Sequence, residues 1–250
     1  MTRLLHTTPI FLIAALASAL PAFAQQKPFE SRGFIVVNGG YQITSNDFEN
    51  ASTFSTNVED GTFTTDYQVK GGPSFDVAGG ARVWRRLAVG VGVTRFSRST
   101  PSTLNGSVPH PFSFNRLRPI TGDVPGLERE ELSVHVQARA IVPIGSRMQV
   151  MAFGGPSFFQ VKQGIVSSFS WAESYPFDEA SFGSATSINA KGSKLGFHAG
   201  MDVAFFFSRQ VGVGGTIQFS GTTVDIESSG GSQEVKAGGA RAGGGLRIRF

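Results

Sequence analysis

The sequence predicts an all-β fold, an eight-stranded antiparallel up-and-down β-barrel. Three observations carry this prediction. Apolar and polar residues alternate with a period of two over most of the chain, short and long connections alternate between the candidate strands, and the strand-like pattern continues to the last residue. A period of two is typical of β-strands, because successive side chains point to opposite faces of a sheet.

The composition agrees with a β-rich chain. Its 250 residues include 32 glycines and 23 phenylalanines, only 16% are charged, and cysteine is absent. Such a composition suits neither a disordered chain nor a helical bundle. The lack of cysteine also excludes a disulfide framework and a lipid attached to a cysteine.

Residues 1–24, "MTRLLHTTPIFLIAALASALPAFA", have the features of a secretory signal peptide. Arg3 lies in the short first part, residues 10–20 are apolar or small, and Ala22 and Ala24 supply the small residues before a cleavage site. The apolar run is too short for the ~20 residues that a membrane-spanning helix needs. We expect cleavage after Ala24 and one β-barrel domain over residues 25–250.

Eight segments of the mature chain read as strands. The clearest alternation is found in residues 132–142, 195–207, 211–223 and 240–250, and four further candidates are residues 33–44, 63–83, 87–97 and 148–162. Each is long enough for the ~9–11 residues that a tilted strand needs to cross a bilayer. In the segment from Met148 the alternation leaves open whether Met151 and Phe153 point inward or outward.

The motif "GGPSF" occurs twice, at residues 71–75 and 154–158. Proline removes a hydrogen-bond donor from a β-ladder. Each copy therefore predicts a bulge or a kink in its strand.

The connections between these segments alternate in length. Three are short and carry arginine, namely residues 84–86, 143–147 and 208–210. The others are longer: residues 45–62, 98–129 and 163–191, with a shorter one at 226–233. Short turns at one end and long loops at the other are typical of barrels that cross an outer membrane.

Alternation alone does not distinguish a membrane barrel from a soluble barrel of the lipocalin kind. Three features favour the membrane. The polar face is rich in Gly, Ser, Arg and Asp, the short turns carry arginine, and the aromatic residues Trp84, Phe205 and Phe207 lie at strand ends, as an interface girdle requires. We therefore expect the apolar face to point toward lipid.

With the apolar face outward, charged side chains fill the interior and should pair across it, because isolated buried charges are costly. The predicted lumen ion-pair network consists of Asp76, Arg82, Glu131, His135, Arg139, Asp202, Arg241, Arg247 and Arg249. An eight-stranded barrel is only just wide enough for its own side chains. The sequence therefore predicts a plugged lumen without an open channel.

The closing segment "LRIRF" reads as a final strand that pairs with the first, and it ends on Phe250. This end resembles the C-terminal strand ending in Phe by which outer-membrane barrels are recognised for insertion. With the strand count and loop asymmetry, residues 33–250 resemble the small eight-stranded outer-membrane β-barrels of the OmpA or OmpX type. The resemblance implies an outer membrane of a Gram-negative-type envelope, with its lipid and lipopolysaccharide as surroundings and the barrel-assembly machinery as a partner.

No residue is predicted to be catalytic. The mature chain has His110, His135 and His198. Some outer-membrane barrels are lipid A deacylases with a Ser two residues after a strand His, but Gln137 and Gly200 occupy the corresponding positions here. No metal or cofactor site is predicted either, since the chain has no His-x-x-x-His, no Cys and no EF-hand spacing. Its glycine runs precede no helix, and the basic pI is weak evidence for a nucleic-acid partner.

The leading interpretation is a non-enzymatic outer-membrane barrel that stabilises the envelope and uses the loops 98–129 and 163–191 to contact lipid or a surface ligand. Trp171 and Tyr175 suit either partner recognition or a lid over the barrel mouth. Four arginines of the first of these loops could contact lipopolysaccharide phosphates, namely Arg98, Arg116, Arg118 and Arg129. The alternatives are a narrow pore or transporter for small or apolar solutes, as in OmpW-type barrels, and a lipid-modifying enzyme.

The assignment of faces predicts opposite behaviour for two neighbouring residues. Arg241→Leu should weaken the barrel by leaving a lumen carboxylate without a partner, whereas Ala240→Leu should be mild because residue 240 faces lipid. Heat-modifiable mobility on gels checks this difference. Equal effects would mean that the faces are reversed.

Overall fold

The computed structural model describes residues 31–228 and 231–250, which form ten antiparallel strands. The expected signal peptide, residues 1–24, lies outside the described residues. Within these ranges no helix is long and apolar enough to span a membrane. Eight of the strands close into a ring, in the order β1, β4, β5, β6, β7, β8, β9, β10 and back to β1. They are β1 (Gly33–Gln42), β4 (Gly72–Trp84), β5 (Leu87–Pro109), β6 (Leu117–Ile144), β7 (Met148–Glu173), β8 (Ala180–Phe206), β9 (Val211–Ser228) and β10 (Gly231–Arg249). The predicted antiparallel barrel is confirmed.

The two remaining strands form an added hairpin. β2 (Asn46–Thr56) and β3 (Glu59–Val69) lie in the connection between β1 and β4, and β3 also pairs with β5 beyond the end of β4. The expected single strand over residues 63–83 is therefore wrong. Lys70 and Gly71 interrupt it, and its two parts belong to β3 and β4.

The first and last strands close the ring. β1 pairs with β10 from Phe34↔Arg249 onward. At the end of this ladder the Gly33 N–H donates to the Phe250 carbonyl at 2.7 Å, and the Phe250 N–H donates back to the Gly33 carbonyl at 3.0 Å. Over the length in which β1 pairs with both β10 and β4, the ring therefore has no free edge that could pair with another chain.

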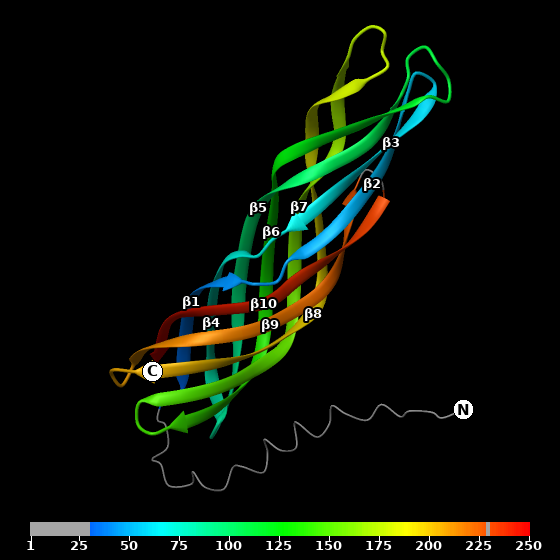
Figure 1. Ribbon diagram of the computed structural model, residues 1–250. Coiled ribbons are helices and arrows are strands. Elements are labelled where there is room, and N and C mark those ends of the chain that lie inside the picture. The colour runs from blue at the N-terminus through cyan, green and yellow to red at the C-terminus, as the bar shows by residue number, and fades with distance from the viewer. Residues whose placement is uncertain (1–30, 229–230) are drawn as a thin grey trace, which may run out of the picture. The chain divides into compact units, whose positions relative to one another are not determined.

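The long loops expected at residues 98–129 and 163–191 are mostly strand. β5 and β6 continue to a turn at residues 110–116, and β7 and β8 continue to a turn at residues 174–179. These hairpins and the β2–β3 hairpin extend at the same end, away from the C-terminus (Figure 1). The loop prediction failed because these stretches alternate with the opposite polarity: their outward residues are polar and their inward residues apolar.

The interior changes character along the barrel. Near the short turns it is lined mainly by polar side chains, whereas the extended hairpins enclose an apolar cluster. The buried members of this cluster are Phe63, Tyr67, Leu104, Val124, Leu127, Phe159, Val161, Ile165, Val166, Ala190, Val224, Ile226, Val235 and Ala237. Met151 and Phe153, whose direction the sequence left open, point inward.

Neither copy of GGPSF shifts the strand register. The first copy begins β4 and pairs in register with β1 through Tyr41↔Pro73. In the second copy the β6–β7 ladder resumes unshifted from His135↔Ser157 to Ala138↔Gly154. No register shift is therefore found at these motifs, although the β6–β7 ladder is interrupted at Gly155 and Pro156 of the second copy. The register shifts between β7 and β8 lie between Val166 and Ser168 and between Phe169 and Trp171.

The shift between Val166 and Ser168 ties the β2–β3 hairpin to the barrel. It leaves Ile165 and Val166 both buried, and the Val166 N–H donates to the Tyr67 hydroxyl at 2.8 Å. The Tyr67 ring stacks on Phe48, with ring centroids 4.5 Å apart. Burial raises the pKa of the Tyr67 phenol, so the phenol stays neutral.

Tyr67→Phe should lower the free energy of unfolding by about 1–3 kcal/mol, because the buried Val166 N–H loses its acceptor while the ring stays packed. Denaturant titration in detergent measures this change. Tyr41→Phe is the matched control, since the Tyr41 hydroxyl donates to the Gly71 carbonyl at an exposed position. Equal losses in both variants would contradict a specific role for the buried bond.

Candidate functional sites of the barrel

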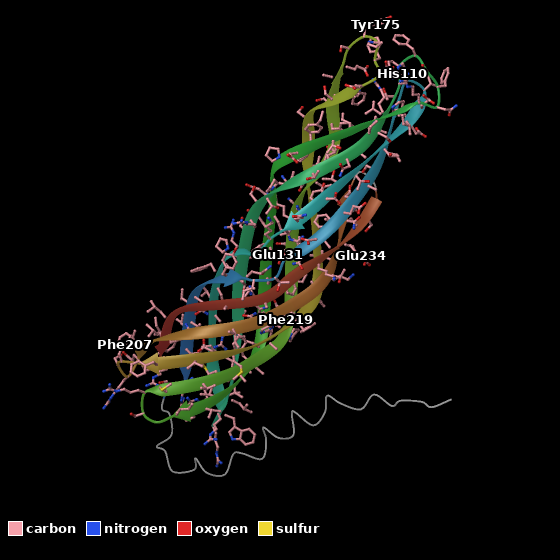
Figure 2. The ribbon with its side chains drawn as sticks, in the orientation of Figure 1. His110, Glu131, Tyr175, Phe207, Phe219 and Glu234 are labelled. Carbon is pink, nitrogen blue, oxygen red and sulfur yellow. The ribbon has the colours of Figure 1, made fainter. Side chains whose placement is uncertain are left out.

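The outer wall carries an apolar belt between two rows of aromatic residues. At the end with the short turns, Trp84, Phe205, Phe207 and Phe250 are exposed. At the other edge of the belt the exposed aromatic residues are Tyr41, Phe75, Phe158, Phe197 and Phe219. Figure 2 shows Phe207 at the turn end and Phe219 farther along the wall. The ten-residue step from Phe197 to Phe207 matches the ~9–11 residues of a bilayer-crossing strand.

A buried ion pair forms the centre of the interior near the short turns. Arg247 of β10 contacts both carboxylate oxygens of Asp202 on β8, with Nε 3.1 Å from Oδ1. Its other nitrogens donate to Asn38 Oδ1 at 2.6 Å and to the Thr216 hydroxyl at 2.9 Å. The Thr216 hydroxyl donates to Asp202 Oδ2 at 2.5 Å. A Cβ on Gly214 would lie 3.0 Å from Arg247 Nε, so glycine leaves the space that the guanidinium needs.

A chain of hydrogen bonds leads from this ion pair to two histidines. Asn38 Nδ2 donates to Asp76 Oδ1 at 2.8 Å, and the Thr94 hydroxyl donates to Asp76 Oδ2 at 3.3 Å. Thr94 Oγ1 also lies 3.1 Å from His135 Nε2. Because the single Thr94 proton goes to the carboxylate, His135 Nε2 carries a proton and donates. This fixes the tautomer of His135 when the ring is neutral, with Nδ1 as an acceptor.

Ser157 connects the two imidazoles. Its hydroxyl lies 2.7 Å from His135 Nδ1 and 2.9 Å from His198 Nδ1, and the two rings have centroids 4.5 Å apart. With His135 Nδ1 as acceptor, the Ser157 hydroxyl donates to it and accepts from His198 Nδ1. All three side chains are only 2% exposed. A serine beside histidine is thus present, but it is enclosed inside the barrel.

The predicted lumen residues differ in their partners. Asp202 and Arg247 form an ion pair with each other, whereas Glu131 pairs with Arg129, which the sequence placed in a surface loop. Among the described residues Arg241 forms no ion pair, and it donates to the Ser220 hydroxyl at 3.4 Å. The sequence predicted that Arg241→Leu would leave a lumen carboxylate without its partner. In the structure that effect is expected of a substitution at Arg247 instead, because Arg247 pairs with Asp202.

Three predicted arginines lie near the turn end of the barrel. Arg139 is buried with its guanidinium 4.6 Å from the Phe34 ring centroid and 5.0 Å from that of Phe153. Arg249 lies 3.9 Å from the Phe206 ring centroid, and Arg82 is half-buried. Arg139 and Arg249 thus both make cation–π contacts, which the sequence did not predict.

A second buried ion pair separates the polar and apolar parts of the interior. Arg129 Nε donates to Glu131 Oε1 at 2.8 Å, and Glu131 Oε2 accepts from the Gly238 N–H at 2.8 Å. Gly238 has φ +85°, a left-handed conformation that favours glycine. Arg129 also donates to the Lys236 carbonyl and to Gln163 Oε1. Both charges are therefore satisfied although they are buried.

Two small cavities lie among the polar side chains of the ring, one of about 10 Å³ around His135, His198 and Asp202, and one of about 20 Å³ beside Arg241. Each holds about one water molecule. Among the described residues no group of three or more His, Cys, Asp or Glu side chains could hold a metal ion.

The hairpin tips are joined to one another. Buried Arg118 bonds to Glu173 at 2.6 Å and donates to the Phe177 carbonyl at 3.0 Å, and Arg116 pairs with Asp178 at 2.8 Å. The Asn115 N–H donates to Glu59 Oε1 at 2.6 Å, which ties in the β2–β3 hairpin. Arg118 and Arg129, expected to reach lipid phosphates, thus point into the protein.

Several of these residues were not singled out from the sequence. Thr94, Ser157 and Asn38 are uncharged, and Arg129 was placed in a loop. The signal available in the sequence was their position in the strand alternation, since each of the four occupies an inward-facing, buried position of its strand.

Removal of Arg247 leaves Asp202 as an unpaired buried charge. We expect Arg247→Met to lower the free energy of unfolding by about 3–5 kcal/mol, and Arg247→Met/Asp202→Leu to recover a large part of that loss. Urea titration in detergent, read by heat-modifiable mobility, measures both. Arg209→Met in an exposed turn is the control and should change little. A double variant as unstable as the single one would show that the carboxylate is not the source of the loss.

No protein-family model and no curated protein matches the sequence. Solved structures of outer-membrane proteins match the chain at low identity and with TM-scores below 0.5. OprG from Pseudomonas aeruginosa is 12% identical, with 88% of this chain and 96% of that chain covered and a TM-score of 0.46. Neisserial surface protein A is 12% identical over 87% and 97% of the two chains, with a TM-score of 0.41. The outer membrane protease OmpT from Escherichia coli is 6% identical over 90% and 99%, with a TM-score of 0.46. The finer assignment to the OmpA or OmpX type stays a prediction.

Proposed function

We propose that this chain is a non-enzymatic outer-membrane β-barrel that stabilises the envelope and presents its extended hairpins for contact outside the cell. The observation that carries the proposal is the closed eight-membered ring with an apolar belt outside and hydrogen-bonded polar groups inside. A soluble barrel has the opposite arrangement. The bilayer is the solvent that accepts such a wall, and closed barrels of this kind belong to outer membranes.

The interior supports a structural role over transport. Its polar side chains bond to one another around Arg247 and around Arg129, and the cavities between them hold about one water each. The apolar cluster of the hairpins lies beyond them. A solute would have to displace two ion-paired layers and this cluster.

The same enclosure argues against catalysis. Ser157 and His135 lie within hydrogen-bond distance, as a nucleophile and base would. However, both side chains are almost fully buried, and the cavity that His135 lines has a volume of about 10 Å³. Because the Ser157 and His135 side chains are each only 2% exposed, we assign these residues to the packing of the barrel.

The far ends of the hairpins form the proposed contact surface. Phe112 and Phe114 are each 76% exposed and Tyr175 is 87% exposed, whereas Trp171 packs against Phe54 and Phe169 inside the extension. Figure 2 shows Tyr175 and His110 at this end. The ion pairs between the tips hold the exposed aromatic residues in place, which favours recognition of a partner.

The proposal predicts an outer-membrane protein that does not conduct. After expression, the protein should be found in the outer-membrane fraction with heat-modifiable mobility, and planar bilayers containing it should show no single-channel steps. Lipid A composition should be the same for the unmodified protein and for Ser157→Ala. Steps that change on Arg139→Ala or Asp202→Asn would establish a pore instead. Lipid A altered only by the protein with Ser157 intact would establish an enzyme.

A further inference from the structure

Cationic side chains gather on the outer wall at the edge of the apolar belt. A groove of about 520 Å³ crosses β5, β6, β7 and β8 on the side away from the short turns. Arg95, Lys162 and Lys191 line it, together with the carboxylate of Glu130. Figure 2 labels Glu131, the residue that follows Glu130 on β6.

The strand register sorts the outward residues of this wall into three rows. The first row is apolar and comprises Val93, Val134, Phe158 and Leu195. The second is mixed and comprises Arg95, Leu132, Gln160 and Ser193, and the third is polar and charged, with Ser97, Glu130, Lys162 and Lys191. Successive rows are about 6.8 Å apart along the strands, so the charges lie at the depth of lipid headgroups when the first row touches acyl chains.

The third row contains an unfavourable pair. Lys162 and Lys191 are directly opposite each other on neighbouring strands, where like charges destabilise a sheet. Glu130 offsets only part of this repulsion. It lies 3.9 Å from Lys162 and 3.3 Å from Arg95, and no ion pair of Lys191 is found among the described residues. The groove therefore has an excess of positive charge that an anion would compensate.

We propose that this groove binds the phosphorylated headgroup of an outer-leaflet lipid, the phosphates of lipid A, with the acyl chains along the apolar row below. This inference rests on the proposed membrane placement, which puts the short turns in the periplasm and the groove in the outer leaflet. Arg95 offers a planar pair of donors, and Lys162 and Lys191 offer point charges on long stems, all suited to phosphate oxygens. Continuity with the belt favours a lipid over a free ion.

The test compares affinities of the detergent-solubilised protein for defined probes, measured by native mass spectrometry. Lipid A with two phosphates should bind at least about tenfold more tightly than lipid A without phosphate. The reason is that each charge-assisted hydrogen bond from a cationic side chain to a phosphate oxygen adds to the binding free energy. Lys162→Gln/Lys191→Gln should reduce that affinity by about tenfold. Lys236→Gln is the matched control, because Lys236 is an exposed lysine of β10 on the opposite wall, and it should leave the affinity unchanged.

A variant that should have the opposite effect on affinity, because it removes a negative charge from the groove, strengthens the test. Glu130→Gln removes the outward-facing carboxylate of the groove, while Glu131, which also lines it, is buried and paired with Arg129. The variant should therefore tighten the binding of phosphorylated lipid A several-fold. Equal binding of the two lipids, or equal losses in the groove and control variants, would overturn the proposal. Inorganic phosphate that displaces the lipid at low concentration would overturn it in favour of a free-anion site.

Heat-modifiable mobility of the same samples separates this proposal from the proposed function. If every variant keeps the folded mobility and remains in the membrane fraction, equal binding of the two lipids by the unmodified protein contradicts the groove proposal alone. If the unmodified protein is soluble without detergent, the membrane placement fails first.

Discussion

Ring closure is the constraint on which the rest of this structure depends. Within a bilayer every backbone N–H and C=O must be paired inside the protein, and the reciprocal bonds of Gly33 and Phe250 complete the last ladder. Once the backbone is satisfied, each strand has one outward and one inward side-chain row. The outward row takes the polarity of the surrounding solvent, and the inward row must then pack and pair with itself. Arg247, held by Asp202, Asn38 and Thr216, shows how completely a long charged side chain is bonded in this interior.

The same strands serve two environments without changing which residues point inward. On β7, Ser157 faces in among polar groups, and Phe159 and Val161 on the same face belong to the apolar cluster. The outward side changes in the reverse sense, from Phe158 to Gln160 and Lys162. The buried ion pair of Arg129 and Glu131 lies where the polar and the apolar parts of the interior meet. Its carboxylate also accepts a hydrogen bond from the Gly238 N–H. Because Arg129 and Glu131 are paired with each other, the polar part of the interior can adjoin the apolar part without an unpaired buried charge at the boundary.

Alternation was enough to predict most of the ring strands near the short turns and the faces of the clearest ones, because parity is a local property of the sequence; the segment 63–83 was wrongly read as one strand. It failed where polarity reverses: residues 98–129 and 163–191 looked like loops because their outward side chains are polar. The segment from Met148 was ambiguous for the same reason, since Phe158 and Phe159 are both apolar on opposite faces. The interior pairs could not be predicted, because Asp202 meets Arg247 across 45 residues and Ser157 meets His198 across 41, and those contacts need the register of three strands.

The inner and outer changes of polarity occur at the same height of the wall. Glu130 and Glu131 are neighbours on β6, one in the outer charged row and the other in the buried ion pair. A barrel in water would have no reason to change its outer wall at the level where its interior changes. A barrel that leaves a bilayer at that level must change the polarity of both its outer wall and its interior. The outer wall enters water there, and the hairpins beyond it need an apolar core to stay folded. The position of Lys162 and Lys191 in that row then follows from the headgroups they would meet, and their mutual repulsion is tolerable in the presence of anionic lipid.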